Sequence, residues 1–143
     1  MMLTAIGLMS GTSLDGVDVA LIETDGRRVK ALGPSGYRPY TEKERGLLRQ
    51  ALYEAADLPD REARPGCLRE AEWAVTSAHA EAVAAFISQH RITFEDVDIV
   101  GFHGQTVLHE RPQDGRPGRT VQLLDAERLA KASGRPVAFD FRT

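Results

Sequence analysis

Three short segments with turn residues between them open the chain. Residues 5–9 are an apolar run closed by the polar turn 10–13, which is the pattern of a strand followed by a turn. Residues 17–23 place apolar side chains at every second position, and Asp25-Gly26 is a common hairpin turn. Residues 28–32 can return as a third strand. The opening therefore predicts an antiparallel meander.

Two later segments carry apolar residues at steps of three and four, which is the period of a helix. The first begins at Thr41, where Glu44 completes a capping-box pattern, and ends at Leu58-Pro59. The second covers residues 65–90 and has the most regular apolar face in the chain. We therefore expect two consecutive helices after the meander.

Strand and helix patterns then alternate. We expect a strand over 97–102, a loop over 110–119, a strand over 120–123, a helix over 125–131 stopped by Gly134, and a strand over 136–141. A meander followed by alternating helices and strands predicts an α/β fold, with a mixed sheet flanked by helices. No linker divides the sequence, so residues 1–143 are expected to form one unit.

Composition excludes several classes of function. The net charge of −3 and the absence of a basic run argue against binding to nucleic acid or to an anionic membrane. No apolar run approaches the roughly 18 residues that span a bilayer. The single cysteine, Cys67, allows no internal disulfide. Because residues 1–9 lack the basic start and cleavage site of a signal peptide, we expect a cytoplasmic protein.

Residues 10–18 (SGTSLDGVD) combine glycines, hydroxyls and carboxylates within one turn. Glycines allow a close backbone approach, and turn amides can form a concave site for an anion. Asp15 and Asp18 can hold Mg²⁺ through water, because Mg²⁺ prefers carboxylate oxygens and keeps several waters. Such a hairpin can cradle the phosphates of a nucleotide. The alternative is an ordinary β-turn with polar side chains.

Residues 101–110 (GFHGQTVLHE) form the second candidate site. A loop at the end of a strand, with glycines, an amide, a hydroxyl and two histidines, can bind a ligand rich in hydroxyl groups. His103 and His109 can instead ligate zinc, as in a metal-dependent hydrolase, with Glu110 as a weak third ligand. No cysteine or further carboxylate stands at a familiar metal spacing, which disfavours zinc.

Together these segments resemble a known family. Residues 9–18 resemble the signature of anhydro-N-acetylmuramic acid kinases, and residues 103–110 resemble the family's second motif. Residues 121–125 (VQLLD), 134–137 (GRPV) and 140–142 (DFR) resemble its third region. Each block alone is a moderate indication. Their order over nearly the whole chain makes the combination specific, and it leaves little weight on the plain-turn reading of residues 10–18.

The resemblance implies the fold of actin-like ATPases and sugar kinases, in which two lobes enclose a nucleotide cleft. Residues 1–143 would be the N-terminal lobe. It also implies a role in peptidoglycan recycling, in which ATP and Mg²⁺ serve to open the anhydro ring of anhydro-N-acetylmuramic acid with water and form N-acetylmuramic acid 6-phosphate. Positioning and electrostatic stabilisation dominate such transfers. A homodimer is left open for the full-length protein.

The resemblance also assigns residues to two ligands. The predicted ATP phosphate loop comprises Gly11, Thr12, Ser13, Leu14, Asp15, Gly16, Val17 and Asp18. The residues predicted beside the sugar are His103, Gln105, Thr106, His109, Glu110, Asp140 and Arg142.

Two features depart from the family pattern. Leu124 stands where the family has glycine, so its side chain is expected to crowd a close approach or a turn with positive φ, and to weaken sugar binding. The catalytic aspartate of the family is expected beyond Thr143, together with the second lobe. Loss of a general base costs about 10²–10⁴ in rate. We therefore expect this chain by itself to be inactive; the alternative is a non-catalytic module that binds nucleotide or sugar.

Overall fold

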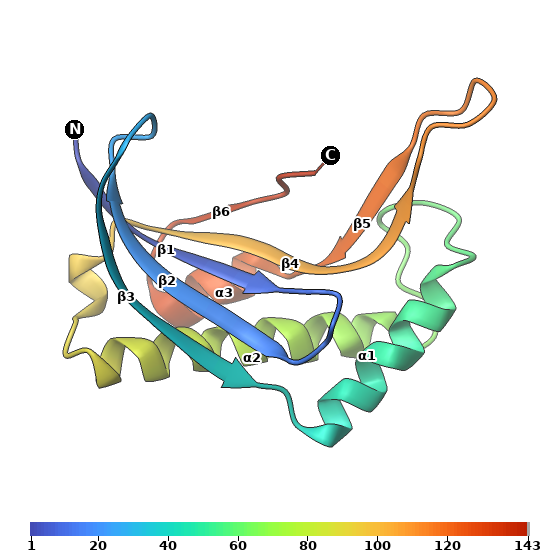
Figure 1. Cartoon of the computed structure of the whole chain (residues 1–143). Helices are drawn as coiled ribbons and strands as arrows, with labels where there is room; N and C mark the ends of the chain where they lie inside the picture. The colour runs from blue at the N-terminus through green and yellow to red at the C-terminus, as the bar shows by residue number, and fades with distance from the viewer. Residues whose placement is uncertain (143) are drawn as a thin grey trace.

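The computed structural model describes residues 1–142, which form a six-stranded mixed sheet with three α-helices on one face (Figure 1). The elements are β1 (Leu3–Ser10), β2 (Gly16–Thr24), β3 (Val29–Pro39), α1 (Glu42–Ala55), α2 (Leu68–Gln89), the 3-10 turn η1 (Phe94–Asp96), β4 (Ile99–Glu110), β5 (Arg119–Leu123), α3 (Ala126–Ser133) and β6 (Val137–Phe139). No helix within the described residues combines the length and the apolar composition needed to cross a membrane.

The sheet confirms the predicted meander and the mixed α/β class. Strands β1, β2 and β3 pair in antiparallel order, with Leu8 opposite Val19. Strand β4 runs parallel to β1 on its other side, so the order is β3-β2-β1-β4-β5. Strand β6 is parallel to the first part of β4, and β5 is antiparallel to the second part. One strand, β4, therefore joins every part of the C-terminal half to the meander.

Local signals set the start of α1 and both ends of α3 as predicted, whereas α1 ends at Ala55, before the predicted Leu58-Pro59. Thr41 caps α1 by accepting a hydrogen bond from the Glu44 amide at 3.1 Å, and the Glu44 side chain accepts one from the Thr41 amide at 2.8 Å. Asp125 caps α3 through the Arg128 amide, and Gly134 ends that helix with φ of 66°. These caps satisfy amide groups that have no partner inside the helix.

The two faces of the sheet differ in what covers them. Apolar side chains such as Ile6, Val17 and Phe102 point toward the helices and pack with Val75 and Phe86 of α2. The opposite face, named here the open face, carries no helix in Figure 1. Its residues include Gly7, Met9, Asp18, Ala20, Tyr37, His103 and Phe141.

β3 and β4 extend well beyond their predicted bounds, while the other strands differ by one or two residues at an end. β3 continues to Pro39 instead of ending near residue 32. β4 was predicted to end at Phe102 with a loop after it; instead, the strand continues to Glu110 and carries the second motif. Gly104 has φ of 78° and bends β4, and the pairing register of β4 with β1 shifts near this point. The strand resumes because β5 supplies antiparallel hydrogen bonds to residues 105–110.

Candidate functional site

The loop between β1 and β2, residues 11–15, is a tight turn that exposes polar groups. The Leu14 amide donates to the Gly11 carbonyl at 3.2 Å and closes the turn. Thr12 and Ser13 are exposed at its tip. Leu14 adopts the left-handed conformation with φ of 59°, yet its side chain is only 5% exposed. Burial of Leu14 therefore anchors the turn and offsets the roughly 1–2 kcal/mol of backbone strain. A small, exposed turn of this kind fits an anionic group.

Gly16 lets β3 pass directly against the end of this loop. A β-carbon at position 16 would lie 2.4 Å from the Arg38 carbonyl oxygen and 2.7 Å from the Tyr37 ring. Since real β-carbons do not approach backbone oxygen so closely, only glycine fits while β3 keeps its position. The loop of the predicted ATP motif is thus tied to the sheet at its second glycine.

The first and second motifs lie side by side, because β1 and β4 are parallel neighbours with Ser10 opposite Gln105. The Ser10 hydroxyl donates to the Gln105 side-chain oxygen. The Gln105 amide nitrogen donates to the Gly11 carbonyl at 3.2 Å. Gln105 is fully buried, so it supports the loop from below. The structure therefore brings together two sequence blocks that are 94 residues apart.

A shallow groove of about 720 Å³ crosses the open face beside this contact. Asp18 of the first motif and His103 of the second line the same groove, with Tyr37, Met9 and Phe141 as its apolar walls. The remaining charged residue of the loop, Asp15, is exposed. The groove offers one carboxylate and one imidazole on an otherwise apolar surface.

A second polar cluster lies at the start of the β4–β5 pair. The Gln122 side-chain nitrogen is 2.9 Å from His103 Nε2 and 3.3 Å from Thr106 Oγ1. Gln122 is 7% exposed, and both of its partners are partly exposed. His103 and Thr106, both predicted beside the sugar, are thus held by one residue of β5.

Three other predicted sugar residues line a separate hollow of about 290 Å³ at the loop end of the β4–β5 pair. His109, Glu110 and Arg142 line it. His109 Nδ1 is 2.8 Å from Thr120 Oγ1. Glu110 pairs with Arg119 at 3.1 Å, and this hydrogen bond lowers the pKa of Glu110 below its usual value. Bending of β4 at Gly104 therefore separates His109 and Glu110 from the groove that contains His103.

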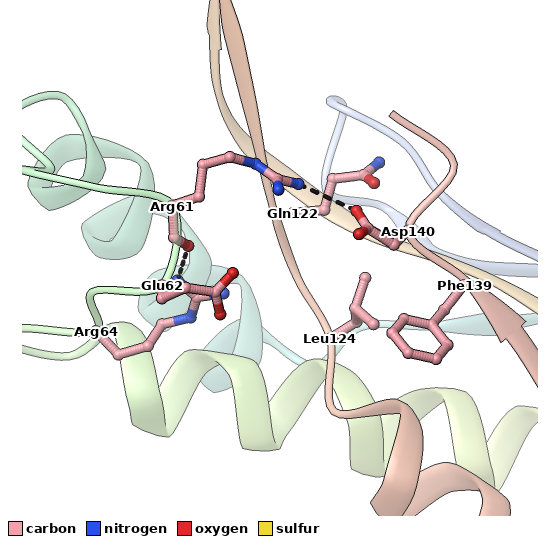
Figure 2. A pocket seen from close by; sticks show the side chains of 7 residues that line it. All are labelled: Arg61, Glu62, Arg64, Gln122, Leu124, Phe139 and Asp140. Atoms are coloured by element: carbon pink, nitrogen blue, oxygen red, sulfur yellow. Dashed lines mark hydrogen bonds and ion pairs between the residues drawn. The ribbon is translucent and has the colours of Figure 1, made fainter. Parts of the chain in front are cut away.

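Asp140 lies in a third pocket, of about 120 Å³, shown in Figure 2. Arg61, from the loop after α1, binds the Asp140 carboxylate at 3.0 Å. Asp140 has φ of 64°, a conformation that aspartate tolerates better than most residues. Gln122 and Leu124 line the wall that faces this ion pair. This pocket therefore joins β5 to the segment after β6.

Leu124 occupies this wall without a strained backbone. Leu124 is not among the described residues with positive φ, so of the two expected reasons for a glycine here the turn does not apply. Its side chain lies against Gly104, where an added β-carbon would be 2.9 Å from Leu124 Cδ2. The space left by Gly104 accommodates Leu124 within the sheet. The effect of Leu124 on sugar binding stays a prediction.

The residues predicted to bind Mg²⁺ or zinc lie in the loop 11–15, in β2 and in β4. Asp15 and Asp18 are both exposed, at the end of the loop and in β2, and binding of Mg²⁺ by them stays a prediction. For the zinc hypothesis, His103 and His109 have separate partners in Gln122 and Thr120. Within residues 1–142, no three His, Cys, Asp or Glu side chains gather as a ligand group.

Three residues of this region were not identified from the sequence as site residues. Tyr40 hydrogen-bonds Ser10 at 2.7 Å beneath the loop, Gln122 holds His103, and Arg61 holds Asp140. Gln122 carried a weak signal, because it lies in the block that resembles the third region. Arg61 and Tyr40 carried none, since their contacts depend on tertiary packing.

The sequence that carries these paired motifs matches the family model of anhydro-N-acetylmuramic acid kinase over residues 3–143. The chain belongs to the anhydro-N-acetylmuramic acid kinase family. It is 72% identical to the anhydro-N-acetylmuramic acid kinase of Rhodopseudomonas palustris (strain HaA2) over 144 residues, which cover 99% of this chain and 38% of the relative. It is 51% identical to that of Caulobacter vibrioides over 138 residues, 96% of this chain and 37% of the relative.

The anhydro-N-acetylmuramic acid kinases that it matches are much longer than the chain. The relative from Bradyrhizobium diazoefficiens is 70% identical over 142 residues, which are 99% of this chain but 38% of the relative. The chain corresponds to the N-terminal part of these kinases. Its sheet, flanked by helices, is consistent with one lobe of a sugar kinase.

Proposed function

We propose that the protein to which this chain belongs is an ATP-dependent kinase of anhydro-N-acetylmuramic acid, acting in the cytoplasm in peptidoglycan recycling. Residues 1–143 form its N-terminal lobe. The observation that carries the proposal is the contact between the two motifs, in which Gln105 of the second donates to Gly11 of the first at 3.2 Å. Membership of the kinase family over residues 3–143 supports it.

In this proposal the loop 11–15 receives the phosphates of ATP, and Asp15 and Asp18 hold Mg²⁺ through water. The metal would neutralise charge on the transferring phosphoryl group. Asp18 and His103 line the same groove, so nucleotide and sugar approach each other over the open face. His109, Glu110, Asp140 and Arg142 extend the sugar side from the neighbouring hollows.

The reaction balances as one hydrolysis and one transfer. Water attacks the anomeric carbon, the bond from that carbon to O6 breaks, and O6 takes the γ-phosphoryl group of ATP to leave ADP. A carboxylate base removes the proton from the water. By resemblance to the family, this base lies beyond Thr143. The chain by itself is therefore proposed to lack turnover.

The test uses the complete gene product with ATP, Mg²⁺ and anhydro-N-acetylmuramic acid in ¹⁸O-labelled water. We expect N-acetylmuramic acid 6-phosphate with the label on the anomeric hydroxyl and none on the phosphate. Unlabelled phosphorylated anhydro sugar, or no product, would contradict the proposal. Asp18→Asn should lower kcat/KM for ATP at least about tenfold, because it removes a positioned charge. Asp114→Asn, an exposed change in the β4–β5 hairpin, is the control.

The 143-residue chain is assayed in parallel. Binding of ATP or sugar without turnover would support a non-catalytic module as the function of this part alone. Turnover above a control without enzyme would contradict the assignment of the base to the longer protein.

A further inference from the structure

Three hydrogen-bonded polar side chains are buried directly beneath the loop 11–15. Ser10 is 2% exposed, Tyr40 is 3% exposed and Gln105 is fully buried. They come from β1, from the residue before the α1 cap, and from β4, so only the folded sheet brings them together. Buried polar groups are costly unless they are hydrogen-bonded, so their arrangement has a defined geometry.

The donors and acceptors of these three side chains fix the direction of each hydrogen bond between them. Gln105 Nε2 lies 3.2 Å from the Gly11 carbonyl and 3.3 Å from the Thr106 carbonyl. Both carbonyls can only accept, so the amide nitrogen faces them and the amide oxygen faces Ser10. The Ser10 hydroxyl must donate to this oxygen. It therefore accepts from the Tyr40 hydroxyl, 2.7 Å away.

Both ends of the loop are attached to these residues. At its start, Gln105 donates to the Gly11 carbonyl. At its end, the Tyr40 amide donates to the Asp15 carbonyl at 2.8 Å. Burial raises the pKa of the Tyr40 phenol to about 12, so it stays a neutral donor at physiological pH. The loop is therefore held at its start by the Gln105 side chain and at its end by the Tyr40 backbone, and the hydrogen bonds through Ser10 connect these two residues.

We propose that Tyr40, Ser10 and Gln105 form a loop clamp that positions the phosphate loop for the nucleotide. The inference rests on the proposed function. Gln105 was predicted to lie beside the sugar. In the clamp its side-chain amide instead binds the Gly11 carbonyl, so it acts on the nucleotide through the loop. Donors held in place before binding need no reorganisation, which is how positioning residues favour transfer.

Tyr40→Phe tests the clamp by removing one hydroxyl and leaving the ring. Tyr53→Phe is the matched control, since Tyr53 is 79% exposed on α1. In the complete gene product, Tyr40→Phe should weaken binding of a non-hydrolysable ATP analogue with Mg²⁺ about threefold to tenfold, because the Ser10 acceptor loses its donor. KM for ATP should rise by a similar factor while KM for the sugar changes less than about twofold.

Amide hydrogen exchange gives a readout that does not depend on any ligand. The amides of residues 12–14 should exchange faster in Tyr40→Phe than in Tyr53→Phe, because the loop opens more often. Thermal unfolding of both variants shows whether the fold is kept under the conditions of the assay.

Gln105→Glu is a second test, because it keeps the shape and reverses the hydrogen-bonding character. Position 105 is fully buried, and burial raises the pKa of a carboxyl, so binding is compared at roughly pH 9, where an ionised carboxylate would face two carbonyl oxygens with no proton to donate. Nucleotide binding should then be weaker than in Tyr40→Phe and should recover partly near pH 5, where a protonated carboxyl can donate to the Gly11 carbonyl.

The outcomes separate the two proposals. If the wild-type protein binds no nucleotide, the proposed function fails and the clamp fails with it. If the wild type binds, but Tyr40→Phe matches Tyr53→Phe in affinity and in loop exchange, the clamp is wrong and the function stands. A loss of thermal stability alone, with affinity unchanged, would assign Tyr40 a structural role and would also overturn the clamp.

Discussion

Gly16 shows how one missing β-carbon sets the position of the phosphate loop. We predict that Gly16→Ala destabilises the protein by about 2–4 kcal/mol, since β3 must move away from the loop to relieve contacts of 2.4 and 2.7 Å. The measurement is the free energy of unfolding from urea titration. Gly46→Ala is the matched control.

Gly46 lies on the exposed side of α1, with nothing within 4 Å of an added β-carbon. The same substitution there should stabilise the protein by about 0.5–1 kcal/mol, because alanine is the better helix former. Equal changes in the free energy of unfolding at the two positions would show that β3 can keep its place beside the loop without glycine at position 16.

Sequence reasoning found the residues of the loop but not the reason for each. The turn glycines, the hydroxyls and Asp18 followed from the local motif and the family resemblance, whereas the close approach of Arg38 to Gly16 depends on a strand 22 residues away. Leu14 was assigned to phosphate contact, yet its side chain is buried as an anchor. A contact between the Leu14 backbone and a phosphate group stays a prediction. Tyr40 precedes a capping box, and nothing in that pattern indicates a use for its hydroxyl.

Between elements, Arg38 of β3 joins both long helices. Its guanidinium is 2.6 Å from Glu44 of α1 and 2.6 Å from Glu81 of α2. Burial alone would raise the pKa of Glu44, but hydrogen bonds from Arg38 and from the Thr41 backbone outweigh it and lower that pKa. The ionised form is therefore favoured by folding. The resulting stabilisation is present above pH 4.5 and is lost as the pH falls below it.

Glu44→Gln tests this ion pair while keeping an oxygen for the capping box. We expect a loss of about 0.5–1.5 kcal/mol at pH 7, because the pair is only partly exposed. The difference from the wild type should shrink as the pH falls below 4.5. Urea midpoints measured from pH 7 to pH 3 provide the test, and 1 M NaCl should reduce the difference at pH 7. A difference that is constant with pH would contradict the linkage.

The helices were predicted nearly in full because their signals are local. Capping residues at 41, 44, 125 and 134 all act within one helical turn. β4 was predicted too short because Gly104 ordinarily breaks a strand, and its continuation depends on β5, whose residue Leu123 pairs with Gln105. Pairing between distant segments leaves no periodic pattern in a single strand. The residues of the second motif, which lie on β4, were therefore expected on a loop.

At the scale of the whole molecule, the open face gathers several exposed apolar side chains in one groove. Met9 is 48% exposed, Tyr37 is 53% exposed and Phe141 is 56% exposed. We predict that the 143-residue chain self-associates and binds a dye specific for apolar surface.

Changing Met9 and Tyr37 together to serine should reduce both dye binding and the apparent mass in solution. Tyr53→Ser, on the surface of α1, should change neither. A monodisperse wild-type monomer that binds no dye would contradict the prediction. Met9 and Tyr37 both line the groove on the open face, away from the core under the helices. Secondary structure measured by circular dichroism should therefore stay constant.

The two hydrogen bonds at the Gly11 carbonyl also have an electronic consequence. This oxygen accepts from both the Leu14 amide and Gln105 Nε2, each at 3.2 Å. Two donors at one carbonyl draw electron density toward its oxygen and enlarge the dipole of the peptide group that it shares with the Thr12 amide. The Thr12 N–H therefore becomes a more polar donor at the exposed tip of the loop, because a buried glutamine binds the negative end of the same peptide dipole.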